Sequence, residues 1–282
     1  MPIDRTPLIG AIVGDIAGSR FEWLNHKSKD FTLLVNRHEG AEPCCFTDDT
    51  VMTLAIADAI MKWRKCGDTS YGALSSWAIK SMQAFGRLYP NAGYGGSFTA
   101  WLEDEKPCPY NSWGNGAAMR VSACGWAGRT LDEVKAMSRA VTEVTHNHPE
   151  GMRGAEATAV ATFLARIGKS MADIRKVVVG NYYRLNFSLD EIRDSYKFDV
   201  SCQGSVPQAL EAFFESTSFE DAIRNAISIG GDSDTIGAIC GAVAGAYYGV
   251  PDNIRTKAMS FLVPNLAETL DAFEHCIGEV RS

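Results

Sequence analysis

Two short stretches of the sequence place aspartates beside threonines, directly ahead of apolar runs. The first stretch is FTDDTVMTLAIADAIM, in which the aspartates are Asp48 and Asp49. The second stretch is GGDSDTIGAICGAVAGAYYG, in which Asp232 and Asp234 lie on either side of a serine and Thr235 follows. Side chains of these types at a helix start accept hydrogen bonds from the first amides, and negative charge there meets the helix dipole favourably. Capping explains one or two side chains in each stretch and leaves the other carboxylates without a role.

A metal site is the second interpretation of these carboxylates. Four carboxylates gathered among apolar helices would repel one another and lose hydration, unless they took up protons or cations. Two divalent cations would neutralise them. Aspartate and threonine oxygens, with no His or Cys nearby in the sequence, suit Mg²⁺, Mn²⁺ or Ca²⁺ better than Zn²⁺. We therefore predict a metal site at the two helix starts, with helix capping as the alternative.

The length, net charge and cysteine content of the chain indicate its domain number and exclude some classes of binding partner. With 282 residues, 46% of them hydrophobic, and no low-complexity or charged linker, the chain is predicted to form one domain over residues 1–282. A net charge of -7 argues against a stable nucleic-acid partner and against binding to an anionic membrane. Eight scattered cysteines without a CxxC pair, and no signal peptide, favour a reduced cytoplasmic chain. Zinc or redox chemistry at Cys44 and Cys45 is the alternative, but no second pair of ligands accompanies them.

The elements that must position the carboxylates are helices. FTLLV and KVVVG are the runs with strand-like composition, and neither has a partner strand joined by a hairpin turn, so the fold class is all-α. Helix-like apolar spacing or composition predicts helices over residues 7–18, 50–65, 70–85, 116–128, 131–144, 152–168, 170–180, 189–194, 205–215, 218–228, 235–248 and 252–277.

Two of these segments, LIGAIVGDIAG and TIGAICGAVAGAYYG, carry three glycines at intervals of four residues. Each glycine costs about 1 kcal/mol of helix propensity relative to alanine, so a close neighbour on that face must offset the cost. A membrane span is the alternative, but the apolar stretch 236–250 is shorter than the roughly 20 residues that a bilayer needs. We expect two central helices packed glycine face to glycine face.

Five segments together resemble a known family. GDIAGSRFEW, FTDDTVMT, SWGNGAAMR, THNHPEG and GGDSDTIGAICGAVAGAYYG occur in the order seen in the ADP-ribosylglycohydrolases, which include dinitrogenase reductase-activating glycohydrolases and ADP-ribosyl-acceptor hydrolases. The resemblance extends from about residue 7 to about residue 252. It implies a compact, single-domain all-α fold with a binuclear metal cleft holding two Mg²⁺ or Mn²⁺ ions. It also implies hydrolysis of the bond between ribose C1″ and an acceptor, with release of ADP-ribose.

The resemblance assigns roles to individual residues. It implies that Glu22 is catalytic near the leaving group, with a solvated loop glutamate as the alternative, and that Asp49 is both catalytic and a metal ligand. The implied metal ligands are Thr47, Asp48, Asp49, Asp232, Asp234 and Thr235. The implied substrate-binding residues are Gly95, Ser112, Trp113, Gly114, Asn115, Gly116, Met119 and His146.

The glycine-rich SWGNGAAMR is expected to begin a helix at Gly116 or Ala117, with free amides and the side chains of Ser112 and Asn115 facing a diphosphate. A plain turn is the alternative. For His146 the alternative is a structural histidine, and for Gly95 a flexible loop. His148, before a proline, is expected to shape its turn.

The expected partners are ADP-ribose and an ADP-ribosylated substrate, and a monomer is favoured. The acceptor stays open among arginine, serine, a nucleic-acid end and O-acetyl-ADP-ribose. Two other functions also stay open. One is a non-catalytic relative that keeps the fold for ligand binding or structure, as in the J-crystallins, and the other is a hydrolase of another ribose derivative.

Overall fold

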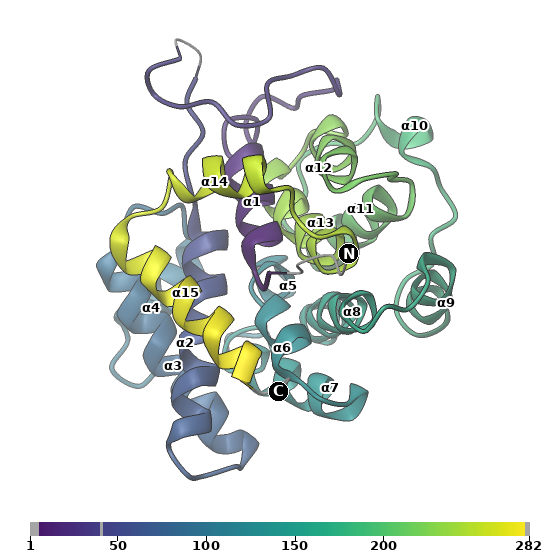
Figure 1. Cartoon of the computed structure of the whole chain (residues 1–282). Coiled ribbons are helices and arrows are strands. Elements are labelled where there is room, and N and C mark those ends of the chain that lie inside the picture. Colours follow the sequence, from purple (N-terminus) through teal and green to yellow (C-terminus); the bar gives the residue numbers. More distant parts are fainter. Residues whose placement is uncertain (1–5, 40–41, 280–282) are drawn as a thin grey trace.

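The computed structural model describes residues 6–39 and 42–279, and within these ranges the chain forms helices and no strand, apart from one isolated bridge between Gly114 and Ser201 (Figure 1). This confirms the all-α prediction. The helices are α1 (Ile9–Gly18), α2 (Asp48–Lys65), α3 (Tyr71–Leu88), α4 (Gly96–Glu103), α5 (Gly116–Met119), α6 (Ser122–Ala127), α7 (Leu131–Thr142), α8 (Pro149–Arg166), α9 (Met171–Asn181), α10 (Leu189–Ile192), α11 (Cys202–Phe214), α12 (Phe219–Ser228), α13 (Ser233–Tyr248), α14 (Asp252–Met259) and α15 (Pro264–Glu279).

Two predicted helices are each divided in the structure, and one helix was not predicted. The segment 116–128 is two short helices, and 252–277 is divided because Pro264, which lacks an amide hydrogen, begins a new helix. Helix α4 was not predicted, since its buried positions Phe98, Trp101 and Leu102 span little more than one turn between glycines and a charged loop. The strand-like KVVVG lies inside α9, and FTLLV has no regular structure.

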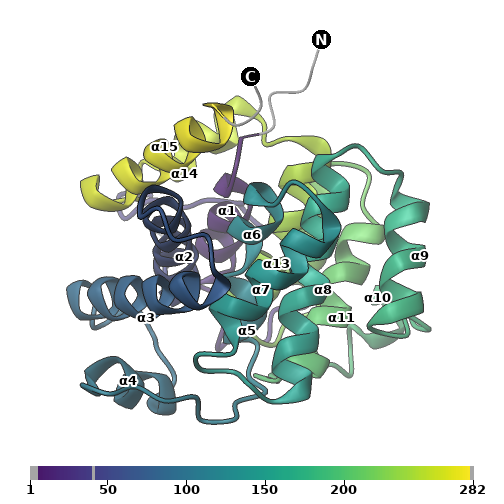
Figure 2. The same ribbon diagram turned by 90° about the horizontal axis from the view of Figure 1, so that it is seen from below.

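Helices α1 and α13 pack antiparallel through their glycines at the centre of the molecule. Figures 1 and 2 both show them side by side, with α2, α8 and α11 close by. A Cβ atom added to Gly10 would meet the carbonyl oxygen of Gly241, and one added to Gly14 would meet that of Gly237. Gly18 faces the backbone of Ser233 in the same way. The expected close packing of the two glycine faces is confirmed.

The packing of the α1 glycines against the α13 glycines also positions the candidate site. Because Gly18 at the end of α1 lies against the start of α13, the loop that follows α1 begins beside the Asp232–Asp234 segment. Glu22 is four residues further along this loop. The glycine contact therefore brings residues more than 200 positions apart in the sequence into one place.

Substituting Gly14 by alanine is expected to destabilise the fold by about 3 kcal/mol or more, because a methyl group forced against the backbone of α13 outweighs a gain in helix propensity of about 1 kcal/mol. Gly180 in α9 is the matched control, since a Cβ there would meet nothing within 4 Å. Urea denaturation of both variants measures the effect. A Gly14→Ala protein as stable as the parent would contradict the backbone contact.

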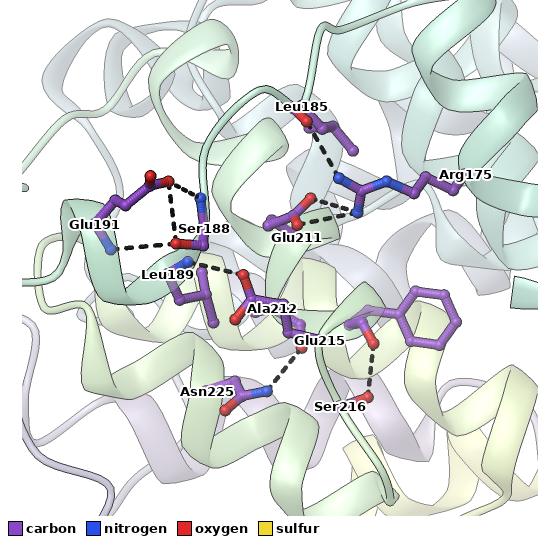
Figure 3. A network of polar contacts seen from close by, with 11 residues as sticks. Arg175, Leu185, Ser188, Leu189, Glu191, Glu211, Ala212, Glu215, Ser216 and Asn225 are labelled. Atoms are coloured by element: carbon purple, nitrogen blue, oxygen red, sulfur yellow. Dashed lines mark hydrogen bonds and ion pairs between the residues drawn. The ribbon is translucent and has the colours of Figure 1, made fainter. Parts of the chain in front are cut away.

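The buried apolar side chains form one connected cluster that extends from Leu8 to Ile277. A separate polar network joins the helices on one side of it (Figure 3). Arg175 of α9 donates to both oxygens of the buried Glu211 of α11, at 2.7 and 3.0 Å, and to the carbonyl of Leu185. The amide of Leu189 donates to Glu215. These contacts fix α9 and α10 against α11, and none of these residues lines the cavity described below.

No helix in the described part of the chain combines the length and the apolar character needed to cross a bilayer. All eight cysteines are free thiols. Cys44 is buried and Cys45 is exposed, and neither belongs to a cluster of potential metal ligands among the described residues.

Candidate metal and ADP-ribose site

A cavity of about 560 Å³ brings most of the predicted site residues together, and its size is in the usual range for small-molecule sites. Its walls come from the loop after α1, the starts of α2, α4 and α13, the 110–120 segment and the 198–200 loop. The predicted residues that line it are Glu22, Asp48, Asp49, Gly95, Ser112, Gly114, Asn115, Gly116, Met119, His146, Asp232, Asp234 and Thr235. Thr47 and Trp113 do not line it.

The carboxylates converge at one part of this cavity. Glu22, Asp232 and Asp234 each offer an oxygen within 4.8 Å of the others. Asp49, only 2% exposed, is joined to the same helix start, because the Thr235 hydroxyl donates to its Oδ2 at 3.2 Å. Residues from the α1 loop, α2 and α13 therefore form one acidic cluster.

The electrostatics of the cluster favour uptake of protons or cations. Burial, followed by the charges of Asp15 and Asp232, raises the pKa of Asp48 to about 8. Burial and neighbouring carboxylates raise the pKa values of Asp49 and Asp234 well above their usual range. Among the described residues, no Lys or Arg forms an ion pair with the carboxylates of Asp48, Asp49 or Asp234.

The pKa of Glu22 is also raised, to about 7. Burial is the largest cause, and the charges of Asp232 and Asp15 add to it, whereas a hydrogen bond from the Trp23 side chain opposes it. A carboxyl group of this kind carries its proton close to neutral pH.

Helix capping accounts for few of the acidic side chains. At α2 the cap is Thr47, whose hydroxyl accepts from the Asp49 amide at 3.3 Å. At α13 the N-cap residue Asp232 makes no side-chain cap, and its carboxylate instead accepts from the Asn115 side chain at 2.6 Å. Capping is therefore insufficient to explain the carboxylates.

The donor set fits a hard divalent cation. Oδ1 of Asp49 is buried and has no hydrogen-bond partner, and such an atom is costly unless a ligand satisfies it. The surrounding donors are carboxylate and hydroxyl oxygens, which Mg²⁺ and Mn²⁺ prefer. Asp48, Asp49, Asp232, Asp234 and Thr235 are the residues that could hold such ions.

Asp15 is a buried carboxylate of the site that the sequence analysis missed. It accepts hydrogen bonds from the amide and hydroxyl of Thr47, at 3.0 and 2.7 Å, and from the amide and hydroxyl of Thr50. These bonds fix the start of α2 against α1. The signal was a lone aspartate within the apolar LIGAIVGDIAG, where a buried charge needs compensation. Thr47, predicted as a metal ligand, directs its hydroxyl toward Asp15.

The loop that carries Glu22 is anchored to the turn before α13. Gly230 and Gly231 have φ angles of 71° and 75°, which glycine adopts without strain. The Gly231 amide donates to the Asn25 side chain at 3.2 Å. Lys27 donates to the carbonyls of Tyr196 and Ile229. The loop that carries Glu22 is thus held beside the start of α13.

The SWGNG loop makes more internal bonds than its sequence suggests. The Gly114 amide donates to the Ser112 hydroxyl at 3.1 Å, and the Asn115 amide donates to the carbonyl of Val200 at 2.7 Å. Helix α5 does begin at Gly116, and the two amides before it are bonded within the protein. The Asn115 side chain orients Asp232, a role that the sequence analysis did not assign.

Arg120 is a second residue that the sequence analysis missed. It lines the cavity and is 1% exposed, and burial lowers its pKa to about 10. Its guanidinium lies over the Phe98 ring and donates to the Thr145 hydroxyl at 2.6 Å, whereas its Nε has no partner. Among the described residues, no carboxylate pairs with it. A buried guanidinium of this kind would interact favourably with an anionic ligand.

Arg120 also sets the state of His146. A guanidinium nitrogen of Arg120 lies 3.3 Å from Nδ1 of His146, and burial lowers the pKa of this imidazole well below its usual range. The Thr145 hydroxyl lies closer to Nδ1, at 2.7 Å, and because the guanidinium only donates and the hydroxyl can also donate, we assign Nδ1 as the acceptor and Nε2 as the nitrogen that carries the proton. Nε2 lies on the side of Gly114 and Gly116, where it can donate into the cavity.

His148 and Trp113 lie near His146 but do not line the cavity. His148 accepts from the Glu150 amide and caps α8, which confirms that it shapes the turn. Trp113, predicted to bind substrate, is 52% exposed and packs edge-on against His148.

The metal-free protein is expected to lose stability as the pH rises from about 4 to about 8. The folded-state pKa values of Glu22 and Asp48, about 7 and about 8, lie above the ordinary values of 4.5 and 3.8. In that interval the folded state binds more protons than the unfolded state, so deprotonation favours unfolding. Thermal denaturation in EDTA measures this, and Mg²⁺ should reverse the trend because a ligand of the folded state stabilises it. A melting temperature that rises with pH in EDTA would contradict the mutual repulsion of the acidic cluster.

Known proteins share this fold and sequence pattern. The human ADP-ribosylhydrolase ARH3 is 25% identical over 321 residues, covering 87% of this chain and 85% of the relative. The ADP-ribosylarginine hydrolase Tri1 of Pseudomonas putida (strain GB-1) is 27% identical over 294 residues, covering 93% of this chain and 76% of the relative. A solved structure, an ADP-ribosylglycohydrolase-related protein complex, superposes with a TM-score of 0.65 at 22% identity, over 96% of this chain and 94% of the other, which shows a shared fold. Residues 5–274 match the sequence profile described as ADP-ribosylglycohydrolase, and the chain therefore belongs to the ADP-ribosylglycohydrolase family.

Proposed function

We propose that this protein is a Mg²⁺- or Mn²⁺-dependent hydrolase that cleaves the bond between ribose C1″ of ADP-ribose and an acceptor, releasing ADP-ribose. The observation that carries the proposal is the convergence of Glu22, Asp232 and Asp234 beside Asp49, in a cavity of a size suited to a small molecule. Membership of the family and the hydrolase activities for which ARH3 and Tri1 are named support it.

The proposed orientation of the substrate follows from charge. The ribose at the scissile bond would lie at the acidic cluster, where bound cations would orient its hydroxyls and lower the pKa of a water. The diphosphate would lie toward Arg120 and the start of α4, whose N-cap Gly95 leaves the first amides without a side-chain cap. The Nε2 proton of His146 would donate to an oxygen of the ligand.

In the proposed reaction, Glu22 donates its proton to the acceptor atom as the bond to C1″ breaks. A pKa near 7 suits this role, because general acid catalysis works best when the pKa lies near the working pH. Asp232 and Asn115 form a hydrogen-bonded pair that holds one edge of the cluster in place. Asp49 keeps one oxygen on Thr235 and leaves Oδ1 available for a cation.

A substrate panel tests this function. The protein with Mg²⁺ or Mn²⁺ is incubated with peptides ADP-ribosylated on arginine or serine, with ADP-ribosylated nucleic acid and with O-acetyl-ADP-ribose, and released ADP-ribose is measured. Release from at least one substrate is expected. Binding of ADP-ribose without release from any of them would identify a non-catalytic relative instead.

A further inference from the structure

Asp15 belongs to α1 but acts at the start of α2. Its fully buried Oδ2 accepts from the amides of Thr47 and Thr50, both at 3.0 Å. Thr47 is the N-cap residue of α2, and Thr50 is its third helical residue. In a capping box these same two amides bond to side chains of the helix itself. Asp15 therefore supplies both halves of a capping box from another helix.

Helix α10 shows the ordinary form of this motif. The Ser188 hydroxyl accepts from the Glu191 amide, and the Glu191 carboxylate accepts from the Ser188 amide. In α2 the residue equivalent to Glu191 is Thr50, which has no carboxylate to reach back to the N-cap. Its hydroxyl donates to Asp15 instead. The start of α2 is thus built to receive a carboxylate from α1.

The remaining amides at the start of α2 are also bonded. The Asp48 amide donates to the carbonyl of Ala92 at 2.8 Å, and the Asp49 amide donates to the Thr47 hydroxyl at 3.3 Å. Each of the first amides of α2 therefore has a partner other than the carboxylates of Asp48 and Asp49. Both carboxylates are left to serve the cavity, which both residues line.

The oxygens of Asp15 are themselves occupied. Oδ2 accepts three hydrogen bonds, and Oδ1 accepts from the Thr47 hydroxyl at 2.7 Å. No Lys or Arg pairs with Asp15 within the described ranges, so these four donors compensate its buried charge. Asp15 does not line the cavity. It is therefore placed to orient the groups around a cation and not to bind the cation.

Helix α1 connects the two halves of the acidic cluster, because it lies between α2 and α13 (Figure 1). Asp15 directly follows Gly14 and precedes Gly18 by three residues, and both glycines meet the backbone of α13. The carboxylates of α2 and those of α13 are thus both held relative to α1. Fixed spacing matters for Mg²⁺, which requires nearly ideal octahedral geometry, whereas Ca²⁺ accepts a looser arrangement of oxygens.

We propose that Asp15 is a positioning residue that holds Asp48 and Asp49 at a fixed separation from the carboxylates of α13, and that it thereby sets the preference of the site for Mg²⁺ over Ca²⁺. The proposal rests on the metal dependence of the proposed function.

The test is calorimetric titration of the whole protein with Mg²⁺ and with Ca²⁺, in the absence of substrate. Thr50→Val keeps the charge of Asp15 and removes one of its hydrogen bonds. It should weaken Mg²⁺ binding about 5- to 20-fold and Ca²⁺ binding less than about threefold. Thr50→Ser, which keeps the hydroxyl, should bind both ions within about twofold of the parent. Asp15→Asn, which also removes a charge, should weaken Mg²⁺ binding about 10- to 100-fold and Ca²⁺ binding less.

Val178→Ala is the control for a general loss of stability, since Val178 is buried in α9 and does not line the cavity. It should lower the melting temperature and leave both affinities unchanged. Equal weakening of the two ions in Thr50→Val, or parent-like Mg²⁺ binding in both Thr50→Val and Asp15→Asn, would overturn the positioning role while leaving the hydrolase function standing. A parent protein that binds neither ion is the separate result that removes the metal-dependent function, and this proposal with it.

Discussion

Asp49→Asn is expected to reduce release of ADP-ribose by about 10³-fold or more, and EDTA should abolish release in the parent protein. Asp49 is 2% exposed, and its Oδ1 has no hydrogen-bond partner, so it is well placed to serve a bound cation. A metal ion supplies several kcal/mol of charge stabilisation in the transition state, which corresponds to a loss of this size. Calorimetric titration with Mn²⁺ should show weakened binding in the variant.

The same variant should be more stable than the parent when both are free of metal. Asparagine keeps the size of the side chain but removes a carboxylate whose ionisation the neighbouring acids oppose. Asp271→Asn, an exposed substitution in α15, serves as the control and should alter neither metal binding nor activity. Full turnover by a chelated sample, shown by elemental analysis to contain no metal, would rule out the metal-dependent mechanism.

Glu22→Gln is expected to lower kcat by about 10²- to 10⁴-fold, the usual contribution of general acid or base catalysis. Glutamine keeps the shape of the side chain and loses only the exchangeable proton, so the affinity for ADP-ribose should change less than about threefold. Single-turnover kinetics and calorimetry with ADP-ribose separate the two quantities. Glu42→Gln, an exposed glutamate in the same loop between α1 and α2, is the matched control and should behave as the parent.

Two other results would assign Glu22 differently. Joint loss of Mn²⁺ and ADP-ribose binding would make it a metal ligand or a structural support, which its proximity to Asp232 and Asp234 also permits. Turnover within a factor of two of the parent would make it a solvated loop residue. The search for the proton donor would then move to Asp49.

The central helix pair and the acidic cluster could be predicted from the sequence, because each depends on residues that are close together in the chain. Glycines four residues apart on two apolar segments indicated the central helix pair, and paired aspartates ahead of apolar runs indicated the acidic cluster. The glycines lie within single helices, where spacing determines which side chains share a face, and the aspartates lie at helix starts, which the apolar runs after them reveal. Helix α4 was missed because its pattern is too short to display a period.

Other features depend on contacts between distant segments, which local spacing does not encode. Asn115 orients Asp232, and Phe198 stacks on Trp23, across 117 and 175 positions respectively, the second being the difference between 198 and 23. Arg120 was visible in SWGNGAAMR, but an arginine is usually exposed, and its burial follows from the packing around it. A carboxylate or guanidinium inside an apolar segment is the signal that would have identified both Asp15 and Arg120.

The backbone contact between α1 and α13 limits how the length of this chain can change. One residue inserted into α1 between Gly14 and Gly18 would rotate everything beyond it by about 100° and advance it by about 1.5 Å. The glycine face would then no longer continue along α13, and the Glu22 loop would leave the helix in another direction. Insertions at the exposed positions 37–39, by contrast, lie beyond the Asn25 and Lys27 anchors and leave this register intact. The segment from Gly10 to Lys27 therefore has a fixed length, whereas the exposed part of the loop that follows it can change in length without disturbing the glycine contact.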